Sequence, residues 1–166
     1  MADAEALFAT HQAGLLRYLS RAVGHGDTAR DLTQDVFVRV VKADALPGAD
    51  GERKAWLFRI ARNLAIDHHR RRHVRGPEVC DAPEPSRTAT QDTTLAVTDA
   101  LGQLDALDRD VFLMRESAGL SYAEISAACE ITPDAVRSRI HRARLQLREH
   151  LSRQIAARRT TPLRTK

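Results

Sequence analysis

The sequence has little cysteine, few aromatic residues and no long apolar run, and each shortage excludes a class of protein. The two cysteines among 166 residues are too few for a disulfide framework and indicate a reducing compartment. No stretch approaches the ~18 apolar residues of a membrane span. The N-terminus also carries acids where a signal peptide needs a basic start. We therefore expect a soluble protein of the cytoplasm, without membrane insertion.

Motifs that carry catalysis are missing as well. The sequence contains no glycine-rich phosphate loop, no Ser-His-Asp order with a nucleophile elbow and no HExxH zinc motif. The sequence therefore predicts neither an enzyme nor a catalytic residue, a metal or a cofactor.

Positive charge is what the chain has in excess. Lys and Arg number 26 against 22 Asp and Glu, which gives a net charge of +4 and a pI of about 9.6. Such a balance favours a polyanionic partner, either nucleic acid or an anionic membrane face. Because aromatic residues are only 4% of the chain, extensive stacking on bases is not expected.

Apolar residues recur at helical spacing along most of the chain, and no alternating strand-like run interrupts them in residues 3–72. The breaker Gly24-His25-Gly26 and the segment ADALPGADGE divide this stretch into three helices. They are expected at about 3–23, from Asp27 or Thr28 as the cap to 43, and at 52–73.

A proline-containing segment follows the third helix, and helical periodicity resumes near residue 93. The predicted fold class is all-α, with two small helical domains on a flexible tether. We expect a first domain at 1–75, a linker at 76–92, a second domain at 93–153 and a basic disordered tail at 154–166.

The second domain has the signals of a helix-turn-helix. An apolar stripe of core residues, expected to pack a preceding pair of helices onto the last one, contains Leu104, Leu107, Val111, Met114 and Ala118. Ser121 and Glu124 fit a capping box at the start of a short helix. Thr132 and Pro133 then mark a second start, as N-cap and first helical residue. Two helices joined by three or four residues are typical of this DNA-binding motif.

The last helix has five arginines and no acid between Arg137 and Arg148. At about 100° per residue, one face is apolar: Val136, Ile140, Ala143, Leu147 and Leu151. The opposite, uniformly positive face contains Arg137, Ser138, His141, Arg144 and Arg148, with Arg142 beside it and Arg139 on the other flank. A solvated helix face would normally mix charges of both signs, so we favour contact with DNA bases and phosphates.

The first domain carries two further surfaces. In the second helix, Asp31, Gln34, Asp35, Val38 and Lys42 share one side, while Leu32, Val36 and Val40 mark another. An ordinary amphipathic helix and a docking surface for a protein both fit this pattern. In the third helix, Trp56, Leu57, Ile60, Ala61 and Leu64 can be buried, while Asn63, Asp67 and Arg70 line up. The helix is strongly basic, which predicts contact with phosphates and, through the preceding loop, with unpaired bases.

The segments DLTQDVF, RKAWLFRIARNLAIDHHRRR and LSYAEISAACEITPDAVRSRIHRAR occur in this order between residues 31 and 144, and the resemblance that they carry extends over nearly the whole chain. They resemble the extracytoplasmic-function sigma factors, group IV of the bacterial sigma-70 family. The resemblance implies an alternative sigma factor that binds core RNA polymerase and promoter DNA and directs transcription initiation. It also implies an anti-sigma factor as a partner. A linker of about twenty residues could span up to ~65 Å, which exceeds one DNA turn of ~34 Å.

The resemblance also implies roles for residues. The expected contacts with core polymerase are Asp31, Gln34, Asp35, Phe37 and Arg39. The expected contacts with the −10 element are Arg59, Arg62, Asn63, Asp67, Arg70 and Arg71, with a flipped base held by the loop 45–51. The expected contacts with the −35 element are Arg137, Ser138, His141, Arg142 and Arg144.

Two other kinds of regulator fit part of the sequence. A stand-alone helix-turn-helix regulator explains residues 121–151 but leaves DLTQDVF and the third helix without a role. A metal-responsive regulator would use His68, His69, His73 and Cys80, but a ligand on the linker has no fixed geometry. Solvated histidines on a basic helix explain the three histidines equally. A structural buried role explains Asp67 and His68 as well as a catalytic role would. Cys129 is expected to be a small buried residue of the scaffold helix.

Overall fold

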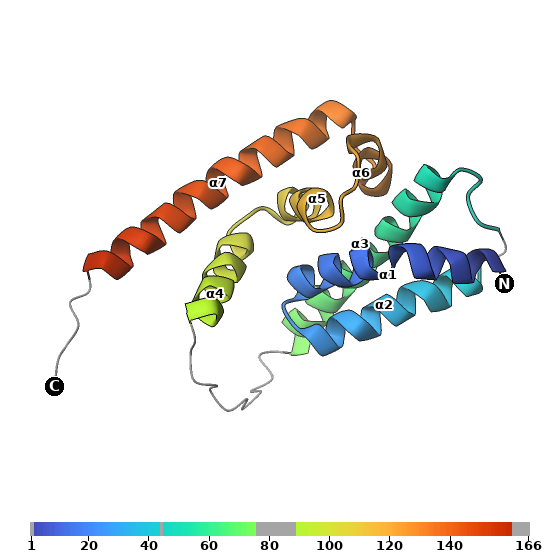
Figure 1. The fold of residues 1–166 in the computed structure, drawn as a ribbon, viewed down its shortest axis with the longest axis horizontal. Helices are drawn as coiled ribbons and strands as arrows, with labels where there is room; N and C mark the ends of the chain where they lie inside the picture. Colours follow the sequence, from blue (N-terminus) through green and yellow to red (C-terminus); the bar gives the residue numbers. More distant parts are fainter. Residues whose placement is uncertain (1, 44, 76–88, 161–166) are drawn as a thin grey trace.

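The structure, a computed structural model, describes residues 2–43, 45–75 and 89–160. Within these ranges every regular element is a helix, which confirms the all-α fold class. Most of the expected linker, with Cys80, lies outside them. Figure 1 shows the helices in chain order: α1 (Ala2–Val23), α2 (Gly26–Val41), α3 (Asp50–Arg75), α4 (Ala89–Gly102), α5 (Ala106–Glu116), α6 (Tyr122–Cys129) and α7 (Pro133–Thr160).

Helices α1, α2 and α3 pack against one another and form what we call the first half, residues 2–75. Apolar side chains at three- and four-residue steps are buried between them: Leu15, Leu19, Val36, Val40, Leu57, Ala61 and Leu64. Each larger one adds roughly 1.5–3 kcal/mol when it leaves water. Of the apolar residues expected to be buried in α3, Trp56 and Ile60 are only half-buried.

The turn between α1 and α2 differs from the expected one. Gly24 adopts a positive φ of 78° and its amide donates to Ser20 O at 3.0 Å, which ends α1. The N-cap of α2 is His25, without a side-chain cap, so the expected cap by Asp27 or Thr28 was wrong. Asp27 lies in the first turn of α2 and instead accepts from Arg30 at 2.5 Å.

Helices α4 to α7 form the second half, residues 89–160. The capping box at the start of α6 is confirmed, because Glu124 N donates to Ser121 Oγ at 3.1 Å and Ser121 N donates to Glu124 Oε2 at 2.7 Å. The start of α7 is confirmed too, since Ala135 N donates to Thr132 Oγ1 at 3.2 Å. The break between α4 and α5 was not located from the sequence. Asp105 caps α5 there and accepts from Leu107 N at 3.1 Å.

Helix α7 runs to Thr160, past the expected start of a disordered tail at residue 154. The physical reason is composition: residues 154–159 are Gln, Ile, Ala, Ala, Arg and Arg, mostly strong helix formers, and the next proline is Pro162. Arg153 also pairs with Glu149 one turn before it. Helix α4 likewise begins at Ala89, inside the expected linker 76–92.

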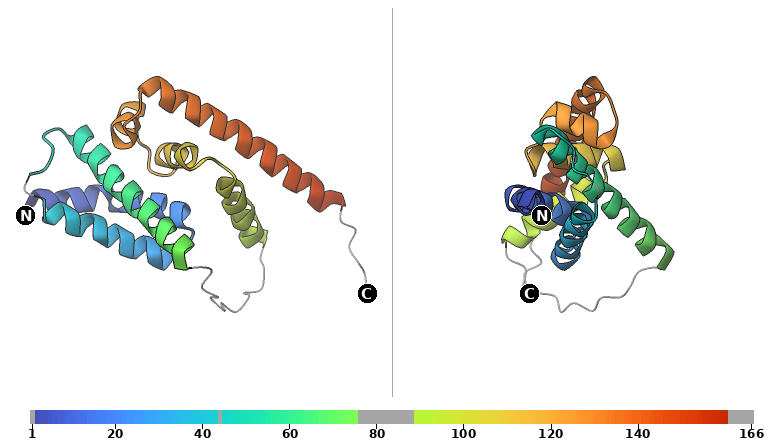
Figure 2. Two further views of the ribbon diagram at one scale, coloured as in Figure 1. Left: turned by 180° about the vertical axis from the view of Figure 1, so that it is seen from behind. Right: turned by 90° about the vertical axis from the view of Figure 1, so that its right-hand side faces the viewer.

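The two halves are not separate modules but pack against each other. Helix α6 lies against α3 and α5 lies against α1, and the buried apolar residues of both halves form one continuous cluster. The two views of Figure 2 show α6 beside the N-terminal part of α3, while α7 extends away from the first half. This contact was not part of the expected picture of two domains on a tether.

Candidate nucleic-acid and protein interfaces

The outer side of α2 is a mixed acidic and apolar surface. Asp31, Gln34, Asp35 and Arg39 are exposed, and between them Val38 keeps 48% of its surface in contact with solvent. Val41 follows at 64%. Apolar side chains flanked by carboxylates, on a helix whose other side is packed, are typical of a protein docking surface.

Phe37 does not belong to this surface. Its side chain is only 8% exposed and its ring packs edge-on against the ring of Phe8, with 4.3 Å between the centroids. The expectation that Phe37 contacts a partner directly was therefore wrong for this conformation. Phe37 lies four positions after Thr33 and three before Val40, which are both buried, so it shares their inward face and holds α2 against α1.

The helix-turn-helix consists of α6, a tight turn and α7. Glu130 ends α6 with a left-handed φ of 57°, and Ile131 N donates to Ser126 O at 3.2 Å. Ser126 Oγ returns a hydrogen bond to Ile131 O at 2.5 Å. These bonds use backbone groups that the ends of two helices leave unpaired, so the angle between α6 and α7 is fixed.

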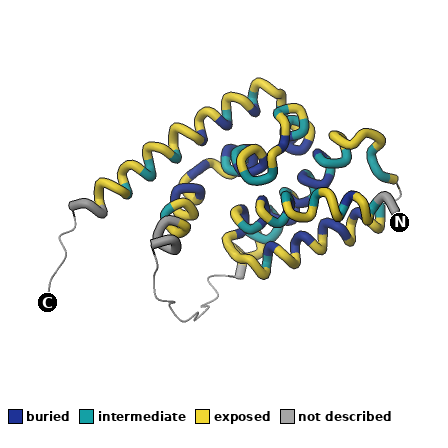
Figure 3. Tube along the Cα trace, in the orientation of Figure 1, coloured by how far each residue is buried: buried dark blue, intermediate teal, exposed yellow. Residues whose placement is uncertain are grey.

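The faces of α7 agree with the expected ones near its N-terminus. Val136, Ile140 and Ala143 are buried, while Leu147 and Leu151 are half-buried where α7 leaves the core. All members of the polar face are exposed: Arg137, Ser138, His141, Arg144 and Arg148. Figure 3 shows this as an exposed outer edge along α7.

Several arginines of α7 are held by carboxylates of the same half. Arg144 Nη2 lies 2.6 Å from Glu116 Oε1, and this hydrogen bond raises the pKa of the guanidinium. Arg137 pairs with Asp134 at 3.2 Å across one turn. These pairs are exposed, so each adds little to stability but orients its arginine.

Asp108 is the buried acid of the second half. Its side chain is 3% exposed and accepts from Arg139 at 2.6 Å and from Arg142 Nε at 3.0 Å. Arg139 also lies 3.8 Å from Asp105. The two ion pairs of Asp108 therefore connect the start of α5 to α7. Arg142 is held through its Nε atom, while 54% of its side chain stays exposed.

Helix α3 presents two kinds of polar residue. Asn63, Arg70 and Arg71 are exposed, and Asp67 is half-buried beside them. Arg59 and Arg62 are also half-buried, because they turn toward the second half. The loop before α3 is held by Arg53, whose Nε donates to Pro47 O at 2.7 Å, and by Ala49 N, which lies 3.4 Å from Glu52 Oε2.

A polar cluster lies where the two halves meet. Asp110 accepts from Arg62 Nε at 3.0 Å and from the Tyr18 hydroxyl at 3.3 Å. Burial raises the pKa of the Asp110 carboxyl, and the neighbouring Arg62 guanidinium opposes that shift. Burial also raises the pKa of Tyr18, so the phenol is the hydrogen-bond donor.

Among the described residues, no group of three or more His, Cys, Asp and Glu could hold a metal ion. His69 Nε2 lies 2.9 Å from Ala22 O and so has a structural partner. His73 is exposed at the end of α3, and Cys80 lies outside the described residues. Cys129 is buried in α6, as expected, and burial raises the pKa of its thiol to about 11.

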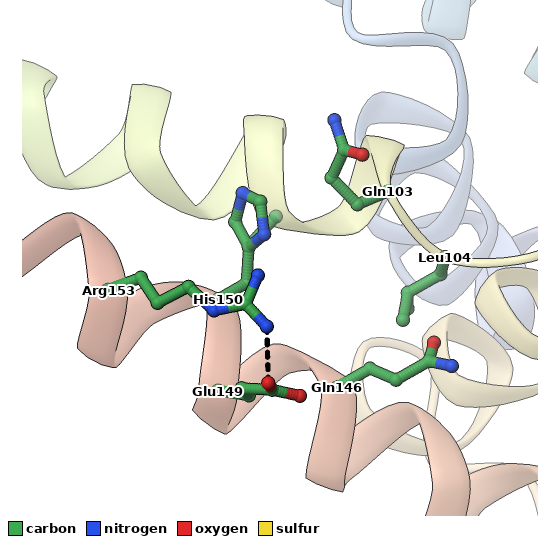
Figure 4. Close-up of a pocket in the computed structure, with 7 residues that line it drawn as sticks. Gln103, Leu104, Gln146, Glu149, His150 and Arg153 are labelled. Carbon is green, nitrogen blue, oxygen red and sulfur yellow. Dashed lines mark hydrogen bonds and ion pairs between the residues drawn. The ribbon is translucent and has the colours of Figure 1, made fainter.

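A small polar cleft of about 220 Å³ lies between the end of α4 and α7 (Figure 4). Amide, carboxylate, imidazole and guanidinium groups make most of its wall: Gln103, Gln146, Glu149, His150 and Arg153. Glu149 pairs with Arg153 there. The cleft lies between two helices of the second half and has no convergent apolar lining of the kind that binds small molecules.

Two family models match the chain in the order of its halves. Sigma-70 region 2 matches residues 7–75, and Sigma-70, region 4 matches residues 94–147. The ECF RNA polymerase sigma factor SigL of Mycobacterium tuberculosis is 34% identical over 153 residues, covering 86% of this chain and 85% of the relative. The chain belongs to the extracytoplasmic-function (ECF) sigma factors. The RNA polymerase sigma factor CarQ of Myxococcus xanthus is also 34% identical, covering 89% of this chain and 88% of CarQ.

Solved structures of sigma factors share the fold. CnrH in complex with the cytosolic domain of CnrY matches with a TM-score of 0.70 at 28% identity, covering 91% of this chain and 88% of that one. The sigma factor RpoE of Bartonella quintana, in complex with the anti-sigma factor NepR, matches with a TM-score of 0.72 at 25% identity, covering 92% and 98%.

This ECF sigma factor is thus an alternative sigma subunit that directs transcription initiation by RNA polymerase. A stand-alone helix-turn-helix regulator is not favoured, because that reading explains the region 4 match alone. No helix of the described residues is long and apolar enough to cross a membrane.

The structure exposes the expected residues of α2 and α7 apart from Phe37. It divides those of α3, because Arg59 and Arg62 turn toward the second half. Sequence reasoning missed three residues that organise the sigma factor: Asp108, Asp110 and Tyr18. Asp108 had a signal, since it falls between Leu107 and Val111 of the apolar stripe, and an acid on a buried stripe needs a cation. Asp110 and Tyr18 are 92 residues apart and had no local signal.

Proposed function

We propose that the ECF sigma factor uses three surfaces at a promoter. The exposed side of α2, with Asp31, Gln34, Asp35 and Arg39, docks on core polymerase. Helix α3 and the segment 45–51, whose last two residues begin that helix, hold the opened −10 strand through Arg59, Arg62, Asn63, Asp67, Arg70 and Arg71. Helix α7 reads the −35 element through Arg137, Ser138, His141, Arg142 and Arg144. The first half carries the first two surfaces, and the second half, which begins with α4 at Ala89, carries the third.

The exposed cationic face of α7 is the observation that carries this assignment. A recognition helix inserts its N-terminal turns into the major groove, and Arg137, Ser138 and His141 lie on the exposed side of those turns. Arginine can contact guanine with two hydrogen bonds, while serine and histidine reach base edges or phosphates. Buried Val136 and Ile140 hold the same turns against α5 and α6 from behind.

The proposed role needs no catalytic residue in this chain. It requires the protein to act in the cytoplasm, together with RNA polymerase. The two solved structures described above are complexes with CnrY and with the anti-sigma factor NepR. We propose that this sigma factor also has an anti-sigma partner. Such a partner would compete with core polymerase for the α2 surface, so it should displace the wild-type protein from core in gel filtration.

Transcription with purified core polymerase tests the function directly. The protein, core polymerase and a library of randomised promoters are combined, and the templates of the transcripts are sequenced. A motif of two separated boxes is expected. Absence of transcription, together with duplex binding by the protein alone, would favour the stand-alone regulator.

Arg137→Ala tests the assignment of α7. The variant should weaken recognition of the upstream box by about 1–3 kcal/mol and leave core binding intact. Arg153→Ala is the matched control. It removes an exposed arginine of the same helix that lies about four helical turns beyond Arg137, outside the proposed −35 surface, where it pairs with Glu149. Equal promoter preference in Arg137→Ala and wild type would contradict the assignment.

Asp35→Arg tests the α2 surface. Reversing an exposed carboxylate should abolish co-elution with core polymerase while the far-UV spectrum and unfolding of the free protein stay unchanged. Asp27→Arg reverses an exposed acid in the first turn of the same helix, outside the proposed surface, and serves as the control. Co-elution of Asp35→Arg with core at wild-type level would exclude this docking surface.

A further inference from the structure

The contact between the two halves pairs basic side chains of α3 with acids of the second half. Arg62 lies 3.0 Å from Asp110, Arg59 lies 3.5 Å from Glu130, and Lys54 lies 3.1 Å from Glu124. Arg59 and Arg62 are two of the residues that the proposed function assigns to the −10 strand.

Carbonyl groups of the second half add to this surface of acceptors. Arg17 Nε donates to Ser117 O at 2.9 Å and Lys54 Nζ lies 3.4 Å from Gly119 O. The short segment from Ser117 to Gly119 therefore faces cations of both α1 and α3. Carboxylates and carbonyls offer to these cations what a DNA strand offers with phosphates and base edges: hydrogen-bond acceptors, many of them charged.

We infer that the packed arrangement of the two halves is an autoinhibited state of this chain. In it, acids on α5 and at the two ends of α6 hold Lys54, Arg59 and Arg62, so the same cations cannot take DNA phosphates. This inference rests on the proposed function of α3. We call the three ion pairs of Lys54, Arg59 and Arg62 the latch. The −35 face of α7 stays exposed in the closed state, so the latch blocks contact with the −10 strand and leaves contact with the −35 element possible.

The chemistry of the pairs suits a latch that DNA or polymerase can open. Arg59 and Glu130 keep 43% and 76% of their side chains exposed, so their attraction is screened by water and salt. The pair of Arg62 and Asp110 is more enclosed, at 21% and 10%. The pair of Lys54 and Glu124 is similarly enclosed, at 21% and 19%. The two enclosed pairs define the closed geometry, and Arg59, in the exposed pair, exchanges its carboxylate for a phosphate most readily.

A disulfide across the contact can lock the closed state. A Cβ atom built on Gly14 of α1 lies 3.9 Å from the Cβ of Ala118, which is within the separation that a disulfide requires. The test protein carries Gly14→Cys and Ala118→Cys in a Cys80→Ser background. Cys129 is retained, because a buried thiol with a pKa of about 11 reacts slowly.

The oxidised and reduced forms of this one protein are compared for binding to a fluorescent single-stranded DNA of mixed sequence and for transcription with core polymerase. If the lock lowers the open fraction at least tenfold relative to the reduced protein, affinity for the strand should fall at least about tenfold and return on reduction. Each single-cysteine variant should behave alike with and without oxidant.

Each result decides between the claims. Equal strand binding by the oxidised and reduced forms would overturn the autoinhibition, and so would failure of the disulfide to form under mild oxidant. Failure of the reduced form to bind the strand and to support transcription would instead refute the proposed function.

A charge reversal tests the latch without a cross-link. Glu130→Lys places a cation against Arg59 and should raise strand affinity about 2- to 5-fold beyond a control with the same change of charge. Glu149→Lys is that control, because Glu149 is an exposed acid of α7 that pairs with Arg153 and not with α3. Equal gains in the two variants would mean that net charge, and not opening, explains the effect.

Discussion

Asp108→Asn is the substitution that best tests how the second half is held together. The carboxylate of Asp108 is nearly buried and accepts from Arg139 and Arg142 at 2.6 and 3.0 Å. Asparagine has almost the same shape but is neutral: its carbonyl oxygen can still accept from one guanidinium group, while its NH2 group turns donors toward the other. The variant therefore changes charge and hydrogen bonding while volume stays nearly constant.

The expected loss follows from the exposure of the partners. Removing one member of a fully buried ion pair costs about 3–5 kcal/mol, because the other charge stays buried. Here the arginine side chains are 28% and 54% exposed, so both can recover water. Two hydrogen bonds to a charged group, each worth about 1.5–3 kcal/mol, are partly replaced by solvent. We expect a loss of about 2–3 kcal/mol in the free energy of unfolding.

Urea unfolding followed by far-UV circular dichroism measures this loss. The midpoint should fall while the slope m stays constant, since the folded state is unchanged in extent. Asp134→Asn is the matched control: it removes an acid of α7 that pairs with Arg137, but this acid is 89% exposed, so the loss should stay under about 1 kcal/mol. Equal small losses in the two variants would refute the structural role of Asp108.

Three further substitutions probe separate features of the fold. Gly14→Ala should stabilise the protein by about 0.5–1 kcal/mol, because alanine favours the helix more than glycine does. The new methyl group meets Phe58 Cζ at 3.7 Å, which is an ordinary contact, so a lower melting temperature would contradict this prediction. Ser121→Ala removes the hydroxyl half of the capping box with Glu124 and should cost about 1 kcal/mol in urea unfolding; an unchanged midpoint would show that the cap is not formed in solution. Burial and nearby cations lower the pKa of His68 below 6.5, so the unfolded chain binds that proton more tightly and stability is lost as the pH falls through the lowered pKa. His68→Gln should therefore flatten the loss of melting temperature below pH 6.5, and an identical slope would contradict this cause.

Local features of this sigma factor were predictable from the sequence because they depend on neighbours within one turn. The capping box at Ser121, the N-cap at Thr132 and the buried face with Val136 and Ile140 follow from residue type and helical period. Phe37 was misassigned because a family motif shows which segment meets a partner but not which side of the helix each residue takes.

Contacts between distant segments were not predictable in the same way. The ion pair of Arg62 with Asp110 joins residues 48 apart, and either residue alone resembles any polar residue of an amphipathic helix. The packing of the two halves depends on such pairs and on a shared apolar cluster. A sequence with one linker and two motifs is compatible with both an extended and a closed chain, so only coordinates distinguish them.

Carboxylates pair with several arginines of the proposed DNA surfaces, and this pairing affects how those arginines can bind DNA. A net charge of +4 leaves few cations uncompensated overall, and in the structure carboxylates lie beside arginines of both proposed DNA surfaces: Glu116 beside Arg144, Asp108 beside Arg142, and Asp110 beside Arg62. Binding of DNA then exchanges a carboxylate for a phosphate rather than stripping water from a bare cation. Each arginine has a negatively charged partner both in the free protein and in the DNA complex. The affinity for DNA therefore depends on how many carboxylates must be displaced at once. An arginine whose acid is partly exposed, as Glu116 beside Arg144 is, exchanges it for a phosphate readily. The contact around Asp110 releases Arg62 only when the two halves separate, which couples engagement of the −10 strand to opening of the whole chain.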